Sequence, residues 1–225
     1  MDERVRAAVE NNANWCDLVC RSHGIPTSWL EGFWVSRQPT PRFYPEAITL
    51  RENVAPEQVI AELPAGICSV KDSFADLDLA SHGFELLFEA TWISRTPTAS
   101  TAPAGGWTTL STESDFVRWR EACGLVDVLP TALLDEESVR FLQRKRRQSV
   151  SSGAVLNRGG SIVGLTNLFS TNAPLDEVWN DVAALCGQQF PSCPIVGYAR
   201  DQDLEAAISS GFTELAVLRV WLEKH

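Results

Sequence analysis

Lys71, Asp72 and Ser73 form the densest group of chemically reactive side chains in the sequence. They lie where a short predicted strand gives way to a turn. Open α/β sheets often bind ligands at the ends of their strands, so this turn is a candidate site. The alternative interpretation is structural: Lys71 pairs with Asp72, and Ser73 or Asp76 caps the helix that follows.

A second candidate is the basic run of residues 144–147 (RKRR). Val139, Phe141 and Leu142 follow Asp135. This pattern predicts a helix that Asp135 caps and that the basic run ends. Cations are stabilised at the C-terminal end of a helix by its dipole, which explains the run structurally. The alternative is an anion-binding site.

No metal site is predicted. Cys16 and Cys20 lie one helical turn apart, a spacing that packing of one helix face explains, and no second pair with ligand spacing accompanies them. The two internal histidines, His23 and His82, fall at predicted helix ends, where capping explains them.

The charge and the distribution of apolar residues exclude some classes of function. The 225 residues carry a formal net charge of −10, which argues against a nucleic-acid-binding protein. Residues 1–12 are polar and charged, and no apolar run reaches the roughly 20 residues that a membrane span needs. We therefore expect a cytoplasmic protein with reduced thiols and no membrane association, and the sequence leaves its oligomeric state open.

Two segments of the chain, 68–95 and 194–223, resemble each other. The matching positions are Asp76-Leu77 with Asp203-Leu204, Gly83-Phe84 with Gly211-Phe212, and Trp92 with Trp221. Each segment reads as a strand, a polar turn, a short helix ended by glycine and a long apolar strand. A repeat of this length indicates two copies of one structural unit.

The predicted helices, strands and linker around the repeat indicate that the chain is divided into two domains. Residues 3–23 have helical periodicity and stop at Gly24, and Thr112 begins a capped helix that Gly124 ends. In the second half, 153–157 and 161–169 read as strands and 174–185 as a helix. The Pro- and Gly-rich segment 96–106 reads as a linker, which predicts domains at 1–98 and 107–225.

The shared order of helix, strand, strand, helix, strand, helix, strand, with Gly-Phe after a short helix, resembles the GNAT acetyltransferase superfamily. The resemblance implies an α/β (α+β) fold of two GNAT-like domains in tandem, each a mixed sheet flanked by helices. It also implies an acyl-CoA-dependent N-acetyltransferase that takes acetyl-CoA or another acyl-CoA and a small-molecule amine. By position, Leu168, Phe169 and Ser170 would lie along the pantetheine arm, with Thr171 and Asn172 nearest the phosphates.

The sequence departs from the superfamily at two motifs. Loops 170–174 and 51–56 lack the glycines of the Arg/Gln-x-x-Gly-x-Gly/Ala loop, whose backbone N–H groups hold the pyrophosphate. Leu79 and Ala207 stand where the family usually has a tyrosine general acid. These departures favour an alternative function, a non-catalytic GNAT-fold module that binds a ligand or a protein.

A general base is expected near the end of the family's fourth strand. The resemblance makes Asp72 and Glu52 the catalytic candidates in the first half. Asp176 is the candidate in the second half.

Overall fold

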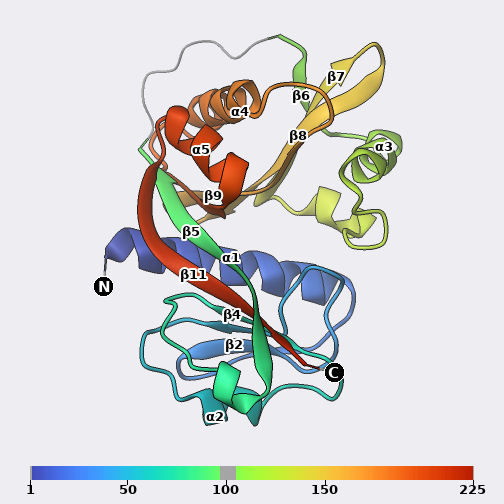
Figure 1. Ribbon diagram of the computed structural model, residues 1–225. Helices are drawn as coiled ribbons and strands as arrows, with labels where there is room; N and C mark the ends of the chain where they lie inside the picture. Colours follow the sequence, from blue (N-terminus) through green and yellow to red (C-terminus); the bar gives the residue numbers. More distant parts are fainter. Residues whose placement is uncertain (1, 97–104, 225) are drawn as a thin grey trace. The chain divides into compact units, whose positions relative to one another are not determined.

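The computed structural model describes residues 2–96 and 105–224. The chain forms two compact units (Figure 1): residues 1–92 and 215–225 make the first, and residues 93–214 make the second. Most of the predicted linker lies outside the described residues. No described helix combines the length and the apolar character that crossing a membrane requires.

The first unit begins with helix α1, Glu3–Ser22. Asp2 caps it by accepting the N–H of Arg4 at 2.8 Å, and Gly24 ends it with φ +72°. This helix confirms the predicted one. The remaining elements that lie wholly in this unit are β1 (Thr27–Trp29), β2 (Phe33–Ser36), β3 (Ala47–Thr49), α2 (Pro56–Ile60), β4 (Ser69–Asp72) and a 3₁₀ turn (Ala80–His82).

The strands of the first unit form a mixed sheet in the order β1-β2-β3-β4-β11-β5. β3 and β4 are parallel, whereas β2 pairs with β3 and β11 with β4 in antiparallel fashion. Its core combines apolar side chains of the sheet and of α2, among them Phe33, Val59 and Trp221. Burial of these side chains stabilises the unit by the hydrophobic effect.

The strands that lie wholly in the second unit are neighbours in the order β10-β9-β8-β7-β6, and they continue the same 11-stranded sheet. Its elements are β6 (Trp107–Thr109), α3 (Glu113–Cys123), a 3₁₀ turn (Thr131–Asp135), β7 (Val139–Arg146), β8 (Ser149–Gly159), β9 (Ile162–Ser170), α4 (Leu175–Gln189), β10 (Ile195–Ala199) and α5 (Asp201–Ser209). β10 runs parallel to β9, and the other pairs are antiparallel.

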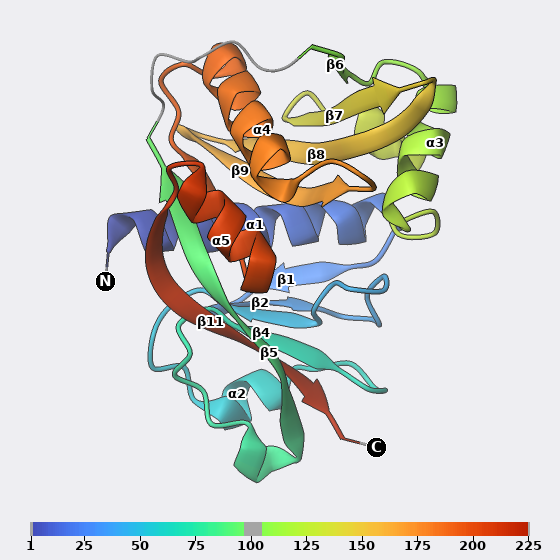
Figure 2. The same cartoon turned by 45° about the horizontal axis from the view of Figure 1, so that its top comes forward.

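Helices cover both faces of the sheet in the second unit. Figures 1 and 2 show α4 lying across β8 and β9, and its residues Val178 and Val182 are fully buried in the core. On the other face, Trp119 of α3 packs edge-on against Phe141 and Phe169 at centroid distances of 5.3 and 5.2 Å. The predicted mixed sheet flanked by helices is therefore confirmed.

Two long strands, β5 (Phe84–Arg95) and β11 (Thr213–Glu223), contribute residues to both units. Each closes one copy of the sequence repeat, and both copies have the order strand, short helix, strand. Trp92 and Trp221 both belong to the first unit. The tandem arrangement and the boundaries 1–98 and 107–225 stay predictions.

The predicted helix that ends in the basic run is wrong. Residues 139–146 form β7, which pairs with β8 from Val139↔Asn157 to Arg146↔Ser149. Asp135 ends a 3₁₀ turn and caps no α-helix. Pairing across the hairpin outweighs the local helical pattern, and so the helix-dipole explanation of the basic run no longer applies.

Candidate functional site

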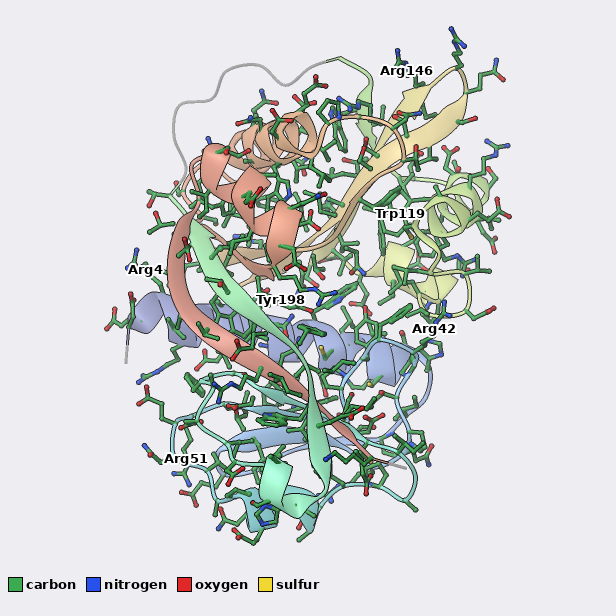
Figure 3. All side chains as sticks on the ribbon, in the orientation of Figure 1. Arg4, Arg42, Arg51, Trp119, Arg146 and Tyr198 are labelled. Carbon is green, nitrogen blue, oxygen red and sulfur yellow. The ribbon has the colours of Figure 1, made fainter. Side chains whose placement is uncertain are left out.

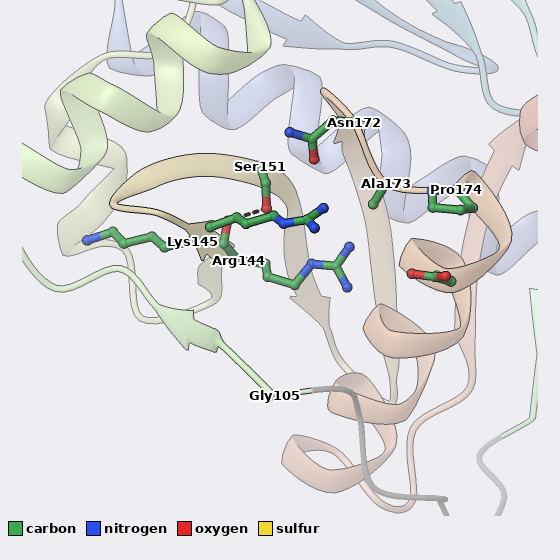
Figure 4. Close-up of a pocket in the computed structure, with 9 residues that line it drawn as sticks. Gly105, Arg144, Lys145, Ser151, Asn172, Ala173 and Pro174 are labelled. Carbon is green, nitrogen blue, oxygen red and sulfur yellow. Dashed lines mark hydrogen bonds between the residues drawn. The ribbon is translucent and has the colours of Figure 1, made fainter.

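A pocket of about 430 Å³ lies in the second unit between the β7–β8 hairpin and the start of α4 (Figure 4). The residues that line it are Gly105, Arg144, Lys145, Arg146, Ser151, Asn172, Ala173, Pro174 and Glu177. Three of these side chains are cationic and one is a carboxylate. The pocket therefore has the charge expected of a site for an anionic ligand.

A β-bulge brings the hairpin residues to the pocket. The register between β7 and β8 shifts between Arg144 and Lys145, which leaves Ser151 outside the ladder. The Ser151 hydroxyl donates to the Arg144 carbonyl at 3.0 Å, a bond drawn in Figure 4. Bulges re-aim side chains, and here the bulge lets Arg144, Lys145 and Arg146 all reach the pocket.

Arg144 is held rigidly. Its Nη1 donates to Asp181 Oδ2 of α4 at 3.0 Å, and the side chains of the two residues are only 13% and 10% exposed. Asp181 Oδ2 also accepts the Trp107 indole N–H at 2.9 Å, and the Arg144 guanidinium lies 5.5 Å from the Trp107 ring centroid. Asp181 neutralises much of the Arg144 charge, so Arg144 forms a fixed wall of the pocket.

The other two cations differ in their surroundings. Lys145 Nζ contacts Asp115 Oδ1 at 2.8 Å, so part of its charge is also compensated. Arg146 is exposed and lies at the outer end of the hairpin (Figure 3). Within the described residues no salt bridge to Arg146 is formed, which leaves its guanidinium available to a ligand.

The loop between β9 and α4 uses most of its polar groups internally. Ser170 Oγ donates to the Ala173 carbonyl at 2.8 Å and accepts the Ala173 N–H at 3.0 Å. The Thr171 N–H and hydroxyl both donate to the Ser151 carbonyl, at 2.9 and 3.2 Å. These bonds fix the loop against β8 and remove two of its amides from ligand binding.

The first turn of α4 supplies further donors. Pro174 is the N-cap residue and no side chain caps the helix. The unpaired N–H groups of a first helical turn attract anions. Asp176 and Glu177 stand in this turn, and Glu177 lines the pocket, so a carboxylate opposes part of that attraction.

Of the five residues predicted to bind the cofactor, one lines the pocket, and that residue is Asn172. Its side chain is exposed, and neither Asn172 nor Thr171 caps α4. Leu168 packs against the core beneath α4, whereas Phe169 packs on Trp119 on the other face of the sheet. Binding of a cofactor by residues 168–172 stays a prediction.

β9 and β10 pair at only two positions, Ile195↔Val163 and Val196↔Gly164. β9 continues to Ser170 and contains Asn167 with φ +50°, next to a shift in its register with β8. The two strands carry no carboxylate or imidazole, and Tyr198 has their one ionisable side chain. This part of the second unit therefore offers strand edges and amides but no ordinary general base.

The catalytic candidates Asp72 and Glu52 belong to the first unit. Asp72 is fully buried and accepts the N–H groups of Phe74, Asp76 and Leu77 at 3.4, 3.2 and 3.1 Å. Burial raises its pKa, an effect that these hydrogen bonds reduce. Asp72 thus organises a turn, while Glu52 lies exposed in a loop; the catalytic role of either stays a prediction.

The other candidate groups are also structural. Lys71 Nζ donates to Asn12 Oδ1 at 2.7 Å, and the Ser73 N–H donates to Thr49 Oγ1 at 2.8 Å. No group of three or more metal-ligating side chains occurs in residues 2–96 and 105–224.

Sequence reasoning did not place the basic run at this pocket. The anion-site interpretation of residues 144–147 was the pattern that pointed to it, and the helix prediction concealed its relation to residues 172–174. Ser151 carries no pattern of its own, because the bulge that brings it to the pocket wall depends on the register of β7 and β8.

Comparison with known proteins gives a fold. No protein-family model matches the sequence, and no curated protein matches it either. A GCN5-related N-acetyltransferase from Kribbella flavida aligns with a TM-score of 0.64 and 10% identity, covering 100% of this chain and 97% of that one.

Two further solved structures agree. A GNAT-family acetyltransferase from Novosphingobium aromaticivorans, described as putative, has a TM-score of 0.62 and 8% identity, covering 94% of this chain and 96% of that one. A conserved protein of unknown function from Staphylococcus epidermidis has a TM-score of 0.61 and 7% identity, covering 85% and 84% of the two chains. At these identities the likeness shows the fold alone: the chain has the fold of GNAT acetyltransferases.

Proposed function

We propose that the second unit binds an acyl-coenzyme A and transfers its acyl group to the amine of a small molecule. The observation that carries this proposal is the cationic pocket at the uncapped start of α4, in a chain with the GNAT fold. Phosphate groups bind well to helix N-termini and to arginine side chains.

The residues present fit a phosphate-bearing donor. Arg146, Asn172 and the first-turn amides of α4 would hold the phosphates, and Arg144 would shape the wall. Because the loop lacks a glycine nest and Glu177 faces the pocket, we expect a dissociation constant in the micromolar range or weaker, about −8 kcal/mol or less favourable.

In the transfer step, the protein would position the reactants and stabilise the oxyanion, without a general base of its own. The amine nitrogen attacks the thioester carbonyl, the C–S bond breaks, and coenzyme A leaves as the thiol. A strand amide near the Asn167 bulge would stabilise the oxyanion. Since β9 and β10 carry no carboxylate or imidazole, the amine loses its proton to water or buffer. This predicts a rate that rises with pH through the pKa of the acceptor amine.

A non-catalytic role is the second candidate function, and the same absence of an acid or base favours it. The buried Ala207 on α5, where the family usually has a tyrosine, points the same way. Under this alternative, the pocket binds its ligand without turnover.

Two measurements separate the candidates. Acetyl-CoA at a hundred times its dissociation constant should stabilise the fold by about 2.7 kcal/mol, a shift of several degrees in melting temperature. At the same concentration of acetyl-CoA, Arg146→Glu should reduce that shift by about half or more, and Arg6→Glu, an equal charge change at an exposed position of α1, should preserve it. Release of thiol from acetyl-CoA with a panel of amines then tests turnover. A shift without thiol release supports the binding module; no shift at millimolar acetyl-CoA contradicts the proposed acyl transfer and any module that binds acyl-coenzyme A.

A further inference from the structure

The tip of the β7–β8 hairpin presents cations in a fixed arrangement. Arg146 pairs with Ser149, so Arg147 and Gln148 form a two-residue turn. Both have positive φ, 49° and 69°, in a turn type that usually takes Asn and Gly. This turn places Arg147 directly after Arg146, which lines the pocket.

These cations belong to a strongly basic segment of an otherwise acidic protein. Residues 144–147 are all basic in a chain whose net charge is −10. Arg144 and Lys145 are paired with Asp181 and Asp115, whereas Arg146 and Arg147 are exposed and form no salt bridge within the described residues. The unpaired positive charge therefore lies at the hairpin tip, where Arg146 also lines the pocket.

The inner end of the pocket combines few free donors with two carboxylates. In loop 171–174, the N–H groups of Thr171 and Ala173 are bonded within the protein and Pro174 has none, so the remaining donors are the amide of Asn172 and those of the first turn of α4, where Asp176 and Glu177 oppose an anion. Coenzyme A carries a diphosphate and a 3′-phosphate. A phosphopantetheine arm attached to a protein carries one phosphodiester, which needs fewer donors inside and an anionic surface outside.

We propose that the hairpin tip, Arg146 and Arg147, is a docking surface for an acidic acyl carrier protein whose phosphopantetheine thioester enters the pocket. This inference rests on the proposed acyl transfer and names a macromolecular donor for it. The chemistry is balanced as before: the amine–carbonyl bond forms, the C–S bond breaks, the amine's proton passes to water or buffer, and the departing carrier thiolate is protonated from the same solvent to a free thiol. An acidic carrier fits because opposite charge at an interface rim speeds association and selects the partner.

The test compares one tethered and one free form of the same arm. Purified bacterial holo-acyl carrier protein and coenzyme A are titrated into the full chain at about 50 and 300 mM salt, a range over which screening of exposed charges changes markedly. We expect the carrier to bind at least ten-fold more tightly than coenzyme A at low salt, and to lose at least ten-fold in affinity at high salt.

Charge reversal gives the decisive comparison. Arg147→Glu should weaken carrier binding at least ten-fold more than it weakens coenzyme A binding, and Arg6→Glu should change carrier binding less than two-fold. Unchanged melting temperatures show that both variants fold.

Several results would overturn the inference. If coenzyme A binds and the carrier binds no better than the free arm, the carrier proposal fails and acyl transfer from coenzyme A stands. If neither binds, both fail. A single-stranded RNA that competes with the carrier at equal affinity would identify the tip as a nonspecific anion surface.

Discussion

Gly153 of β8 is the position where one added methyl group should damage the second unit most. A Cβ built there would lie 2.3 Å from Trp119 Nε1, 2.6 Å from Phe169 Cε1 and 2.9 Å from the Leu142 carbonyl oxygen. Trp119 is fully buried, and its indole N–H donates to that same carbonyl at 2.9 Å. Neither ring can move without breaking this bond or the aromatic cluster.

The cost of Gly153→Ala follows from these contacts. Overpacking a core costs about 1–3 kcal/mol. Leaving a buried donor or acceptor without its partner costs about 1–3 kcal/mol more. Alanine recovers roughly 0.4–1 kcal/mol by restricting the unfolded chain. We expect the free energy of unfolding to fall by ~1–6 kcal/mol, a large part of the ~5–15 kcal/mol typical of a protein.

Urea denaturation followed by near- and far-UV circular dichroism measures this change. Gly105→Ala is the matched control, because a Cβ there meets no atom within 4 Å and needs no left-handed backbone; it should stay within about 0.5 kcal/mol of the native protein. Gly153 pairs with Phe169 beside the bulge before loop 170–174, so Gly153→Ala should also weaken ligand binding. A loss of less than about 1 kcal/mol would refute the packing described for Trp119.

Three further predictions concern other parts of the chain. Gly197→Ala places a Cβ 2.7 Å from the Leu165 carbonyl and should force β9 and β10 apart, lowering stability by about 1–3 kcal/mol in urea denaturation; an unchanged midpoint would contradict the close approach. Burial raises the pKa of Asp17, but its side-chain hydrogen bonds outweigh burial and lower it overall. The stability that Asp17 adds is thus present above its unfolded pKa of about 3.9 and lost as pH falls through the lower folded value. The difference in melting temperature between the native protein and Asp17→Asn should shrink below that pH, and a constant difference would count against this coupling. Burial raises the pKa of the Cys186 thiol to about 12, whereas Cys193 is half-buried, so iodoacetamide at pH 8 should modify Cys193 first, as peptide mass spectrometry would show; faster modification of Cys186 would contradict its burial.

Local patterns predicted the elements that depend on local chemistry. Thr112 caps α3 by accepting the Asp115 N–H at 3.2 Å, and Gly124 ends that helix with φ +72°, both as the sequence indicates. The segment 139–146 was wrongly predicted as a helix, since its apolar residues do not alternate strictly and its strand character comes from pairing with β8. Register of this kind is a tertiary property that a single sequence hides.

In the candidate site, too, some residues could be predicted from the sequence, whereas others depend on tertiary structure. Resemblance to GNAT proteins led to Asn172, because its place after the long strand is fixed by the element order. Arg144, Arg146 and Ser151 reach the pocket through a hairpin and a bulge, and their partner Asp181 lies 37 residues from Arg144 in the chain. No spacing rule in the sequence joins these residues.

Isothermal titration of acetyl-CoA into the full chain tests the central claim, that the pocket at the start of α4 binds the acyl donor. We expect saturable binding with a dissociation constant in the micromolar range or weaker, roughly −8 kcal/mol or less favourable. Arg146→Glu and Asn172→Asp should each weaken binding about ten-fold or more, the equivalent of about 1.4 kcal/mol, and Arg6→Glu should leave it intact. No heat at millimolar acetyl-CoA, or binding that both pocket variants leave unchanged, would contradict it.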